Sequence, residues 1–269
     1  MNIGIFDSGL GGLIITRSLI RQLPKYNYFY LGDTARLPYG NRSQEAIYQF
    51  TKEAMDYFFQ NNCGLVIIAC NTASAEALPK IQQEYLPKNH PDKKVLGVII
   101  PSAEEVAQYT KNQKIGILAT QSTVHSKAFK REIKKLLPNA QVFQQAAPLL
   151  VPLIENQGIK WINPILDEYL KSLLSQKIDT LILGCTHYAY LKSIIRKRVG
   201  SKIKIISQDE FVPDKLEQYL INHSEIESLL NKNTNRTFCV TDLTANFQDL
   251  ANKLFGEEIK LKKVNLKMT

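Results

Sequence analysis

The sequence lacks any segment that would place the protein in or across a membrane. No apolar run among its 269 residues approaches the roughly 20 residues that a helix needs to span a bilayer. The chain opens with MNIGIF, which leads directly into a strand-like run and has neither the basic region nor the cleavage site of a signal peptide. We therefore expect a cytoplasmic protein without a membrane partner.

Cysteine is scarce and forms no metal-binding or redox pattern. The four cysteines, Cys63, Cys70, Cys185 and Cys239, are scattered and make neither a CxxC pair nor a zinc-site spacing. In a reducing compartment they should remain thiols, which makes structural disulfides unexpected. The question is therefore which of them are chemically special.

Acidic residues are outnumbered, with 34 Lys and Arg against 25 Asp and Glu and a net charge of +9. Much of the excess lies in four basic clusters: KREIKK (130–135), RKR (196–198), KIK (202–204) and KLKK (260–263). Such clusters can bind nucleic acid, but no aromatic interleaving and no nucleic-acid motif accompanies them. We interpret them as solvated faces of helices and strands, so nucleic acid is not an expected partner.

Strand-like and helix-like segments alternate along the chain, which predicts an α/β fold with mainly parallel sheets covered by helices. Several strands are continuous apolar runs, as a sheet covered on both faces requires. The expected strands are 2–6, 27–32, 65–69, 94–99, 114–119, 140–145, 180–184 and 202–207. The expected helices are 12–23, 43–61, 73–86, 102–111, 124–137, 160–176 and 188–199.

Two breaks interrupt this alternation. The first is GVIIPSA (97–103), and the second is SQDEFVPD (207–214), after which the chain becomes more polar. The closing residues read as a strand, a helix and a strand. We therefore expect a split arrangement, with a first α/β domain from residues 1–97 and 209–269 and a second from residues 98–208.

In open parallel sheets, ligands bind beyond the carboxyl ends of the strands. The turns expected there are FDSGLGG (6–12), LGDTARLPYG (31–40), ACNTAS (69–74), LATQSTVHS (118–126) and GCTHY (184–188). FDSGLGG is not a dinucleotide fingerprint, because its third glycine position is Ile14, and it lacks the Gly-Lys-Ser/Thr of a phosphate-binding loop. Its backbone N–H groups suit a carboxylate or another anion. Asp7 is either a helix cap or an orienting acid–base group.

Two cysteines occupy matching places in this pattern. Cys70 and Cys185 each follow an apolar strand and a small residue, and each precedes a predicted helix. A helix N-terminus favours a thiolate through its dipole and its backbone donors. One such cysteine would be explained as a small buried hydrophobe, which is how we interpret Cys63 and Cys239. Two matched occurrences indicate chemistry.

A pair of thiols suits some reactions better than others. Cys185 and His187 supply only two metal ligands, so no metal site is expected, and a Cys–His hydrolase would leave Cys70 without a role. Two thiols on opposite sides of a cleft suit removal of a proton from one face of a carbon and delivery of a proton to the other. Asp7 and His187 would tune the thiols. Neutral hydrogen bonds to an anionic substrate would come from Asn71, Thr72 and Thr186.

The motifs DSGLGG, GDTARLPYG, ACNTASA and LGCTHY together closely resemble the glutamate racemases of the cofactor-independent Asp/Glu racemase superfamily. The similarity extends over nearly the whole chain and includes TVHSKAFK, PLLVPLIE and the closing FCVTD and ANKLFGEEIKLKKV. It implies two similar α/β domains with the active site in the cleft between them. It also implies an isomerase that makes D-glutamate for peptidoglycan, and hence for cell shape, without a cofactor or a metal.

The resemblance also assigns expected roles, with L- and D-glutamate as substrates and a homodimer as the assembly. Cys70 resembles the base that acts on D-glutamate, and Cys185 the base that acts on L-glutamate. Asp7 and His187 resemble the acid–base assistants, and Glu155 a further acidic residue of the site. The positions that match substrate contacts are Asp7, Ser8, Pro38, Tyr39, Gly40, Asn71, Thr72, Thr120, Thr123, Thr186 and His187.

The chain departs from this family pattern in three places. Ser102 replaces a usual glycine, Ala189 replaces a proline, and IISQDE (205–210) stands where an Asp-Ser-Gly or Asp-Ser-Ala turn is common. Three alternatives stay open: a racemase of aspartate or another acidic amino acid, a decarboxylase on the same fold, and a regulatory protein whose basic surface binds nucleic acid. The paired thiols disfavour a decarboxylase, which needs only one proton donor.

Overall fold

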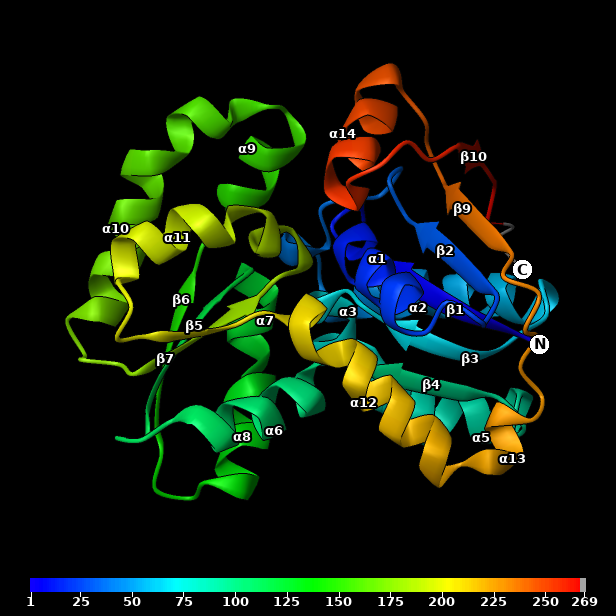
Figure 1. The fold of residues 1–269 in the computed structure, drawn as a ribbon, viewed down its shortest axis with the longest axis horizontal. Coiled ribbons are helices and arrows are strands. Elements are labelled where there is room, and N and C mark those ends of the chain that lie inside the picture. Colours follow the sequence, from blue (N-terminus) through cyan, green and yellow to red (C-terminus); the bar gives the residue numbers. More distant parts are fainter. Residues whose placement is uncertain (267–269) are drawn as a thin grey trace.

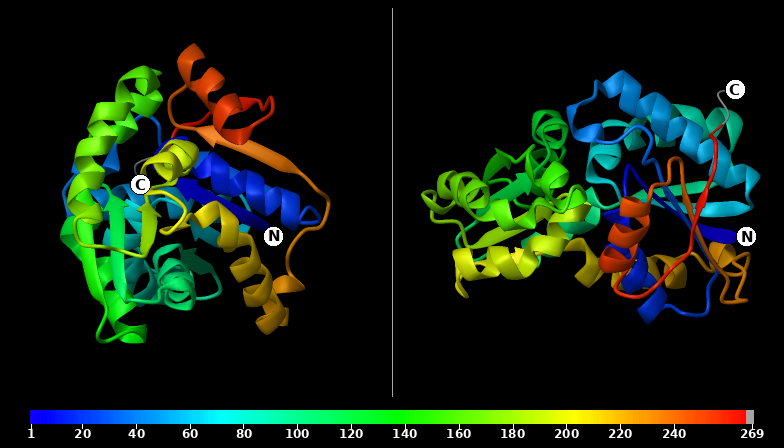
Figure 2. Two further views of the ribbon diagram at one scale, coloured as in Figure 1. Left: turned by 60° about the vertical axis from the view of Figure 1, so that its left-hand side comes forward. Right: turned by 90° about the horizontal axis from the view of Figure 1, so that it is seen from above.

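The computed structural model describes residues 1–266, so the last three residues of the expected first domain lie outside the described part. It contains two β-sheets (Figure 1), in which every pair of neighbouring strands is parallel. The predicted α/β fold with mainly parallel sheets is therefore confirmed. In the view from above (Figure 2), the residues of the two sheets form two lobes that lie side by side along the longest axis.

The large sheet has six strands in the order β10-β9-β2-β1-β3-β4. Its strands are β1 (Asn2–Asp7), β2 (Tyr28–Gly32), β3 (Cys63–Ile68), β4 (Lys94–Gly97), β9 (Arg236–Val240) and β10 (Leu261–Lys263). The small sheet has four strands in the order β6-β5-β7-β8. These are β5 (Lys114–Ala119), β6 (Gln141–Ala146), β7 (Thr180–Gly184) and β8 (Lys204–Ile206).

Helices connect the parallel strands and cover the sheets. The α-helices are α1 (Gly12–Gln22), α2 (Gln44–Gln60), α3 (Asn71–Glu76), α4 (Leu78–Lys80), α5 (Leu86–Asn89), α6 (Ile99–Tyr109), α7 (Gln121–Ser126), α8 (Ala128–Leu136), α9 (Leu150–Glu155), α10 (Ile162–Leu174), α11 (Lys192–Val199), α12 (Gln208–Asn222), α13 (Ser224–Glu227) and α14 (Ala245–Phe255). Shorter turns are the 3₁₀ segments η1 (Tyr39–Asn41), η3 (Gly158–Trp161) and η4 (Thr186–Leu191) and the π segment η2 (Ile81–Tyr85). No helix in the described part of the chain is long and apolar enough to cross a membrane.

The chain passes between the two sheets twice. It leaves the large sheet after β4 through α6, and it returns from β8 through α12 to the strands β9 and β10. The first strand, β1, and the last, β10, therefore belong to the same large sheet (Figure 1). The domain boundaries at 97/98 and 208/209 stay a prediction, since the strand order alone does not define independent units.

The structure differs from the expected helices at several points. The expected helix 124–137 is divided at Lys127 into α7 and α8, the expected helix 188–199 begins as the 3₁₀ segment η4, and α9 was not expected. Helix α6 begins at Ile99 rather than at 102, which places Pro101 in the first turn, where a missing N–H breaks no helical bond. The expected helix 73–86 is divided into α3, α4 and the π segment η2. Helix α12 was missed, because Pro213 inside it and its many polar residues obscure the pattern.

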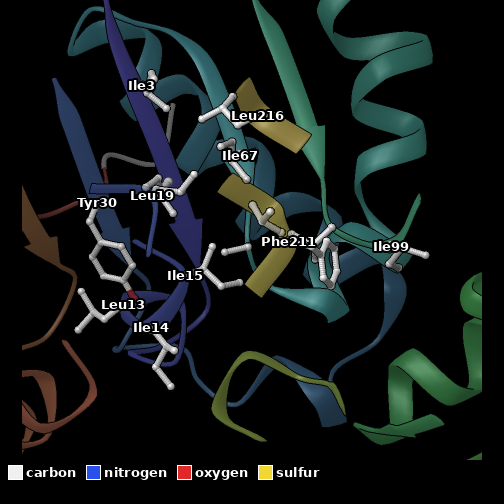
Figure 3. Close-up of a cluster of buried hydrophobic side chains, with 14 of the residues drawn as sticks. Ile3, Leu13, Ile14, Ile15, Leu19, Tyr30, Ile67, Ile99, Phe211 and Leu216 are labelled. Atoms are coloured by element: carbon white, nitrogen blue, oxygen red, sulfur yellow. The ribbon is translucent and has the colours of Figure 1, made fainter. Parts of the chain in front are cut away.

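Helix α12 forms because its apolar residues pack into the core under the large sheet. Phe211, Val212, Leu216 and Leu220 are each 5% exposed or less. Burying such a side chain stabilises the fold by roughly 1.5–3 kcal/mol, which offsets the cost of an internal proline. Figure 3 shows Phe211 and Leu216 near Ile67 of β3, with side chains of α1 packed in the same cluster.

The strand register brings the chemical turns of each sheet together. In the large sheet Phe6 pairs with Ile68, and Asp7 pairs with Gly32, so the turns after β1, β2 and β3 are neighbours. The backbone N–H of Cys70 donates to the Phe6 carbonyl at 3.3 Å. In the small sheet Ala119 pairs with Gly184, so the turn that begins at Thr120 lies beside the turn that begins at Cys185.

Candidate active site

The carboxyl ends of the two sheets face each other, and a hydrogen bond joins them. The Thr186 hydroxyl, after β7 of the small sheet, donates to Oδ1 of Asp7, the last residue of β1 in the large sheet, at 3.2 Å. Asp7 is fully buried, while Cys70 and Cys185 are 5% and 8% exposed. Both thiols predicted from the sequence are therefore largely excluded from solvent, and they lie close enough for Cys185 to affect the pKa of Cys70.

Cys70 is held at the start of α3 with its proton retained. Its Sγ accepts the backbone N–H of Ala73 at 3.5 Å and lies 3.3 Å from Oγ of Ser8. Burial and, to a smaller extent, the nearby charge of Asp7 together raise the pKa of Cys70 to about 12, although the contacts with Ser8 and Ala73 act in the opposite direction. The expected helix N-terminal effect is present, but the loss of solvation outweighs it.

Cys185 has a different partner. Its Sγ lies 3.9 Å from Nδ1 of His187, and Nε2 of His187 lies 2.9 Å from Oε1 of Glu155. Burial lowers the pKa of His187, but its contacts with Cys185 and Glu155 outweigh burial and raise this pKa well above its ordinary value. The imidazole is therefore protonated near neutral pH and is held between the thiol and a carboxylate.

Asp7 links the two halves of the site. Its carboxylate accepts the Gly9 backbone N–H at 3.1 Å as well as the Thr186 hydroxyl. Burial raises the pKa of Asp7, and the positive charge of His187 partly counters this. Both interpretations left open by the sequence stay predictions, because the Asp7 carboxylate accepts the backbone N–H of Gly12 at the start of α1 and its charge also acts on Cys70.

The glycines of FDSGLGG make room for the opposite turn rather than for a nucleotide. A Cβ on Gly11 would come within 2.5 Å of Thr186 Oγ1 and 2.6 Å of His187 Nδ1. Such distances are far below van der Waals contact, so a side chain here would push the two lobes apart. The motif is therefore needed for close approach between the turns after β1 and β7.

A cluster of hydroxyls forms a second link between the lobes. Oγ1 of Thr72 lies 2.9 Å from Oγ1 of Thr120 and 3.3 Å from Oγ1 of Thr123, and the latter two lie 2.9 Å apart. All three threonines are buried. The structure thus brings together three of the predicted substrate-contacting residues, one from α3 and two from the start of α7. Their hydroxyl groups are neutral and can donate hydrogen bonds to an anion.

The segment Pro38–Gly40 reaches the same cluster from β2. Gly40 is so close to Thr120 that a Cβ on the glycine would lie 2.8 Å from the threonine Cβ. The Tyr39 hydroxyl donates its proton to the buried carboxylate of Asp33, so this hydroxyl has no proton left to donate to a ligand.

Asp33 and Arg36 are functional candidates that the sequence analysis missed. Nε of Arg36 donates to Asp33 Oδ2 at 2.7 Å, and the Thr241 hydroxyl donates to Asp33 Oδ1 at 2.8 Å. Arg36 also pairs with Glu53. These contacts hold the loop that carries Tyr39 and Gly40. Asp33 and Arg36 both lie in GDTARLPYG, one of the motifs of the family resemblance, but their partners Glu53 and Thr241 are too distant in sequence to be inferred.

Asn71 was predicted to contact substrate, and its side chain has a partner that the sequence did not indicate. Its amide exchanges two hydrogen bonds with the amide of Gln208, the first residue of α12, at 2.9 and 2.6 Å. Gln208 lies within IISQDE, one of the segments that depart from the family pattern. This departure from the family pattern was the only sign in the sequence that the segment around Gln208 differs from that of the relatives.

The remaining predictions concern groups away from this region. Within residues 1–266 no three His, Cys, Asp or Glu side chains are arranged to hold a metal ion. Cys63 and Cys239 lie in β3 and β9 inside a hydrophobic cluster, as expected for small buried residues. A cavity of about 1040 Å³ is lined by parts of α3, α6, α8 and α12, and none of the predicted catalytic residues lines it.

Several residues of the basic clusters pair with carboxylates of the same chain. Arg131 and Lys135 contact Glu132, Arg198 contacts Asp167, and Lys263 contacts Asp242. This pairing agrees with the interpretation of the basic clusters as solvated faces of helices and strands. Whether the surface binds nucleic acid stays untested by these contacts.

Comparison with known proteins shows which family the chain resembles over its length. The family described as Asp/Glu/Hydantoin racemase matches residues 3–212. A glutamate racemase of Persephonella marina is 38% identical over 268 residues, which are 99% of this chain and 98% of that protein. The crystal structure of glutamate racemase RacE1 from Bacillus anthracis has a TM-score of 0.89 and 34% identity, covering 98% of this chain and 97% of that one. The structure from Francisella tularensis in complex with D-glutamate has a TM-score of 0.87 and 32% identity, covering 98% and 97%.

The parallel two-sheet fold, the two buried thiols and these similarities define the class: the chain belongs to the Asp/Glu/hydantoin racemase family and is an amino-acid racemase, an isomerase. Within that family its full-length relatives are the glutamate racemases. The resemblance seen in the sequence motifs is thereby confirmed.

Proposed function

We propose that the protein interconverts L- and D-glutamate by two-base proton transfer, with the thiols of Cys70 and Cys185 as the two bases. One observation carries this proposal: two buried thiols end strands of different sheets, and a Thr186–Asp7 hydrogen bond holds the ends of those sheets together. Glutamate is the proposed substrate because the full-length relatives carry that name.

In the L-to-D direction, the Sγ of Cys185 takes the α-proton, and the electron pair of the broken C–H bond remains on the α-carbon. The protonated His187, fixed by Glu155, hydrogen-bonds to this sulfur and stabilises its thiolate before the transfer. Cys70 then delivers its own proton to the opposite face of the carbon. Its pKa of about 12 ensures that it carries that proton when the reaction begins.

After one turnover the protonation states of the two sulfurs have exchanged, and the D-to-L direction uses the same steps reversed. Cys70 is then the base for D-glutamate, and Cys185 the acid. The thiolate of Cys70 is assisted by the hydroxyl of Ser8 and the N–H of Ala73, both of which lower its pKa. Matching each enantiomer to one sulfur follows the family resemblance.

The substrate is proposed to lie between the threonine cluster and the thiols. Thr72, Thr120 and Thr123 supply hydroxyl donors, and the backbone around Gly40 approaches the same cluster. Pro38, Asn71 and Thr186 complete the proposed contacts. We further propose a cytoplasmic homodimer that makes D-glutamate for peptidoglycan, with residues 1–97 and 209–269 as one domain and 98–208 as the other.

The test is a circular-dichroism assay of L- and D-glutamate with no added cofactor and with EDTA present. Racemisation in both directions is expected, and L-aspartate at the same concentration should react at least ~100-fold more slowly, because one missing methylene misplaces the carboxylate. In heavy water, deuterium should enter the α-carbon mainly of the product enantiomer. Equal labelling of substrate and product would contradict two separate bases, and faster reaction of aspartate would reassign the substrate.

A further inference from the structure

Three buried polar side chains form a chain of hydrogen bonds beside Cys70. They are Asn71, Ser102 and Gln208, with exposed fractions of 2%, 0% and 3%. Gln208 Nε2 donates to Asn71 Oδ1 at 2.6 Å and to Ser102 Oγ at 3.2 Å, and Asn71 Nδ2 donates to Gln208 Oε1 at 2.9 Å. None of the three is a proton-transfer group in the mechanism above.

The hydrogen-bond inventory fixes which way each amide faces. The hydroxyl of Ser102 donates its only proton to the Val98 carbonyl at 2.6 Å, so its oxygen can only accept from Gln208. Gln208 must therefore turn Nε2, not Oε1, toward Ser102. Both N–H groups of Gln208 are then used, and its Oε1 is left to accept from Asn71. Asn71 in turn has one defined orientation, with its second N–H free to bind a ligand.

These residues lie where the chain passes between the sheets. Asn71 is the first residue of α3, directly after Cys70, and Cys70 caps that helix. Ser102 lies in the first turn of α6, and Gln208 begins α12. Since α6 and α12 are the two connections between the sheets, the amide chain ties both of them to the turn that carries Cys70. Figure 1 shows α12 starting between the two lobes, near α3.

We propose that Gln208 is a positioning residue for proton transfer at Cys70, acting through Asn71 and anchored by Ser102. This inference rests on the proposed two-thiol function. Without the Gln208 amide, Asn71 can rotate by half a turn and exchange its donor for its acceptor, and the start of α3 loses its attachment to α12. Ser102 and the segment around Gln208 are also two of the three departures from the family pattern.

The direction of the effect is testable because the two enantiomers have equal free energy. The ratio of kcat/KM for L- and D-glutamate is therefore fixed at one, whatever the variant. The primary deuterium isotope effect on kcat/KM is not fixed in this way. If proton transfer at Cys70 becomes slower, removal of the α-proton of D-glutamate limits the reaction, and the isotope effect measured with D-glutamate rises toward its full value. With L-glutamate the slow step is then protonation by Cys70, so its isotope effect falls toward one.

The experiment compares Gln208→Met with Gln145→Met, using glutamate deuterated at the α-carbon. Gln145 lies in β6 and hydrogen-bonds to Ser172, away from both thiols, so it controls for the loss of a partly buried amide. We expect Gln208→Met to lower kcat/KM by about tenfold, as for a misplaced acid–base group. The isotope effect should rise with D-glutamate and fall with L-glutamate. Gln145→Met should leave both isotope effects at the wild-type values.

A double-mutant cycle tests whether Gln208 acts through Asn71. In an Asn71→Ala background, adding Gln208→Met should change neither isotope effect further. Unchanged isotope effects in Gln208→Met, or a full additional change in the Asn71→Ala background, would overturn the proposal. If Gln208→Met fails to fold by circular dichroism, Ser102→Ala decides: a smaller shift in the same direction is expected, and no shift rejects the idea.

Failure of the proposed function gives a different result. In that case the wild-type protein itself would show no racemisation, or it would place deuterium from heavy water equally in the substrate and the product. An active wild type with normal isotope effects in Gln208→Met would instead contradict only the role of Gln208.

Discussion

Cys70 and Cys185 end strands of different sheets, and their sulfur atoms have different neighbours. Cys70 lies beside a hydroxyl, a backbone N–H and the carboxylate of Asp7, and its pKa is raised to about 12, first by burial. Cys185 lies beside the imidazole of His187, which Glu155 holds from its other side. The same position at a strand end therefore has two electrostatic environments.

This difference suits a reaction that needs one proton donor and one proton acceptor at the start. A buried thiol next to a carboxylate keeps its proton, whereas an imidazolium beside a sulfur atom can donate a hydrogen bond to it. Two identical environments would leave both sulfurs in the same protonation state. Asp7 contributes to both halves, because it hydrogen-bonds to Thr186 while its charge acts on Cys70.

The largest expected effect comes from removing either sulfur. Cys70→Ala and Cys185→Ala should each lower racemisation by about 10³-fold or more, because each removes one of the two acid–base groups. The measurement is optical rotation of either enantiomer over time. Cys63→Ala and Cys239→Ala, which remove buried thiols from β3 and β9, should keep near-normal activity. Activity near wild type in either Cys70→Ala or Cys185→Ala would end the two-thiol assignment.

Replacing the assistants should separate the two halves of the site. His187→Gln and Asp7→Asn are each expected to lower kcat/KM by about 10²-fold, as for lost acid–base assistance. With α-deuterated substrates, His187→Gln should raise the isotope effect of L-glutamate, and Asp7→Asn should raise that of D-glutamate. If both variants raised the same isotope effect, the two residues would serve one sulfur and the comparison would fail.

Glu155 should act only on the half that contains His187. Its charge helps to raise the pKa of His187, so Glu155→Gln lowers that pKa and the imidazole loses its proton at a lower pH. The alkaline limb of the pH profile of kcat/KM should therefore move to lower pH, with about a tenfold loss at pH 8. The exposed Glu168 of α10 supplies the matched control Glu168→Gln, which should leave the profile unchanged. An unmoved alkaline limb in Glu155→Gln would refute this role.

The smallest expected effect concerns the resting thiol of Cys70. The negative charge of Asp7 raises the pKa of Cys70, so Asp7→Asn should speed alkylation of Cys70 by iodoacetamide at pH 9 by about threefold. Peptide mapping by mass spectrometry measures each cysteine separately. Cys63, whose pKa burial also raises to about 12, serves as the internal control and should react at an unchanged rate. Equal acceleration at both cysteines would indicate loosening of the fold instead.

Much of the architecture could be predicted from the sequence, because its signals are local. Continuous apolar runs such as 114–119 and 180–184 coincide with the observed β5 and β7. Helix α12 could not be predicted in this way, since only packing of Phe211 and Leu216 against the core explains it. The start of α6 was misplaced because Pro101, expected before the helix, lies within its first turn.

The sequence by itself determined the parallel α/β alternation, the family, and the placement of two thiols at strand ends. Only the tertiary structure decided what surrounds each thiol. Glu155 and His187 are 32 residues apart, Asn71 and Gln208 are 137 apart, and Asp7 and Thr186 are 179 apart. Burial and nearby charges set the protonation of a sulfur, and both depend on residues that come together only when the two sheets face each other.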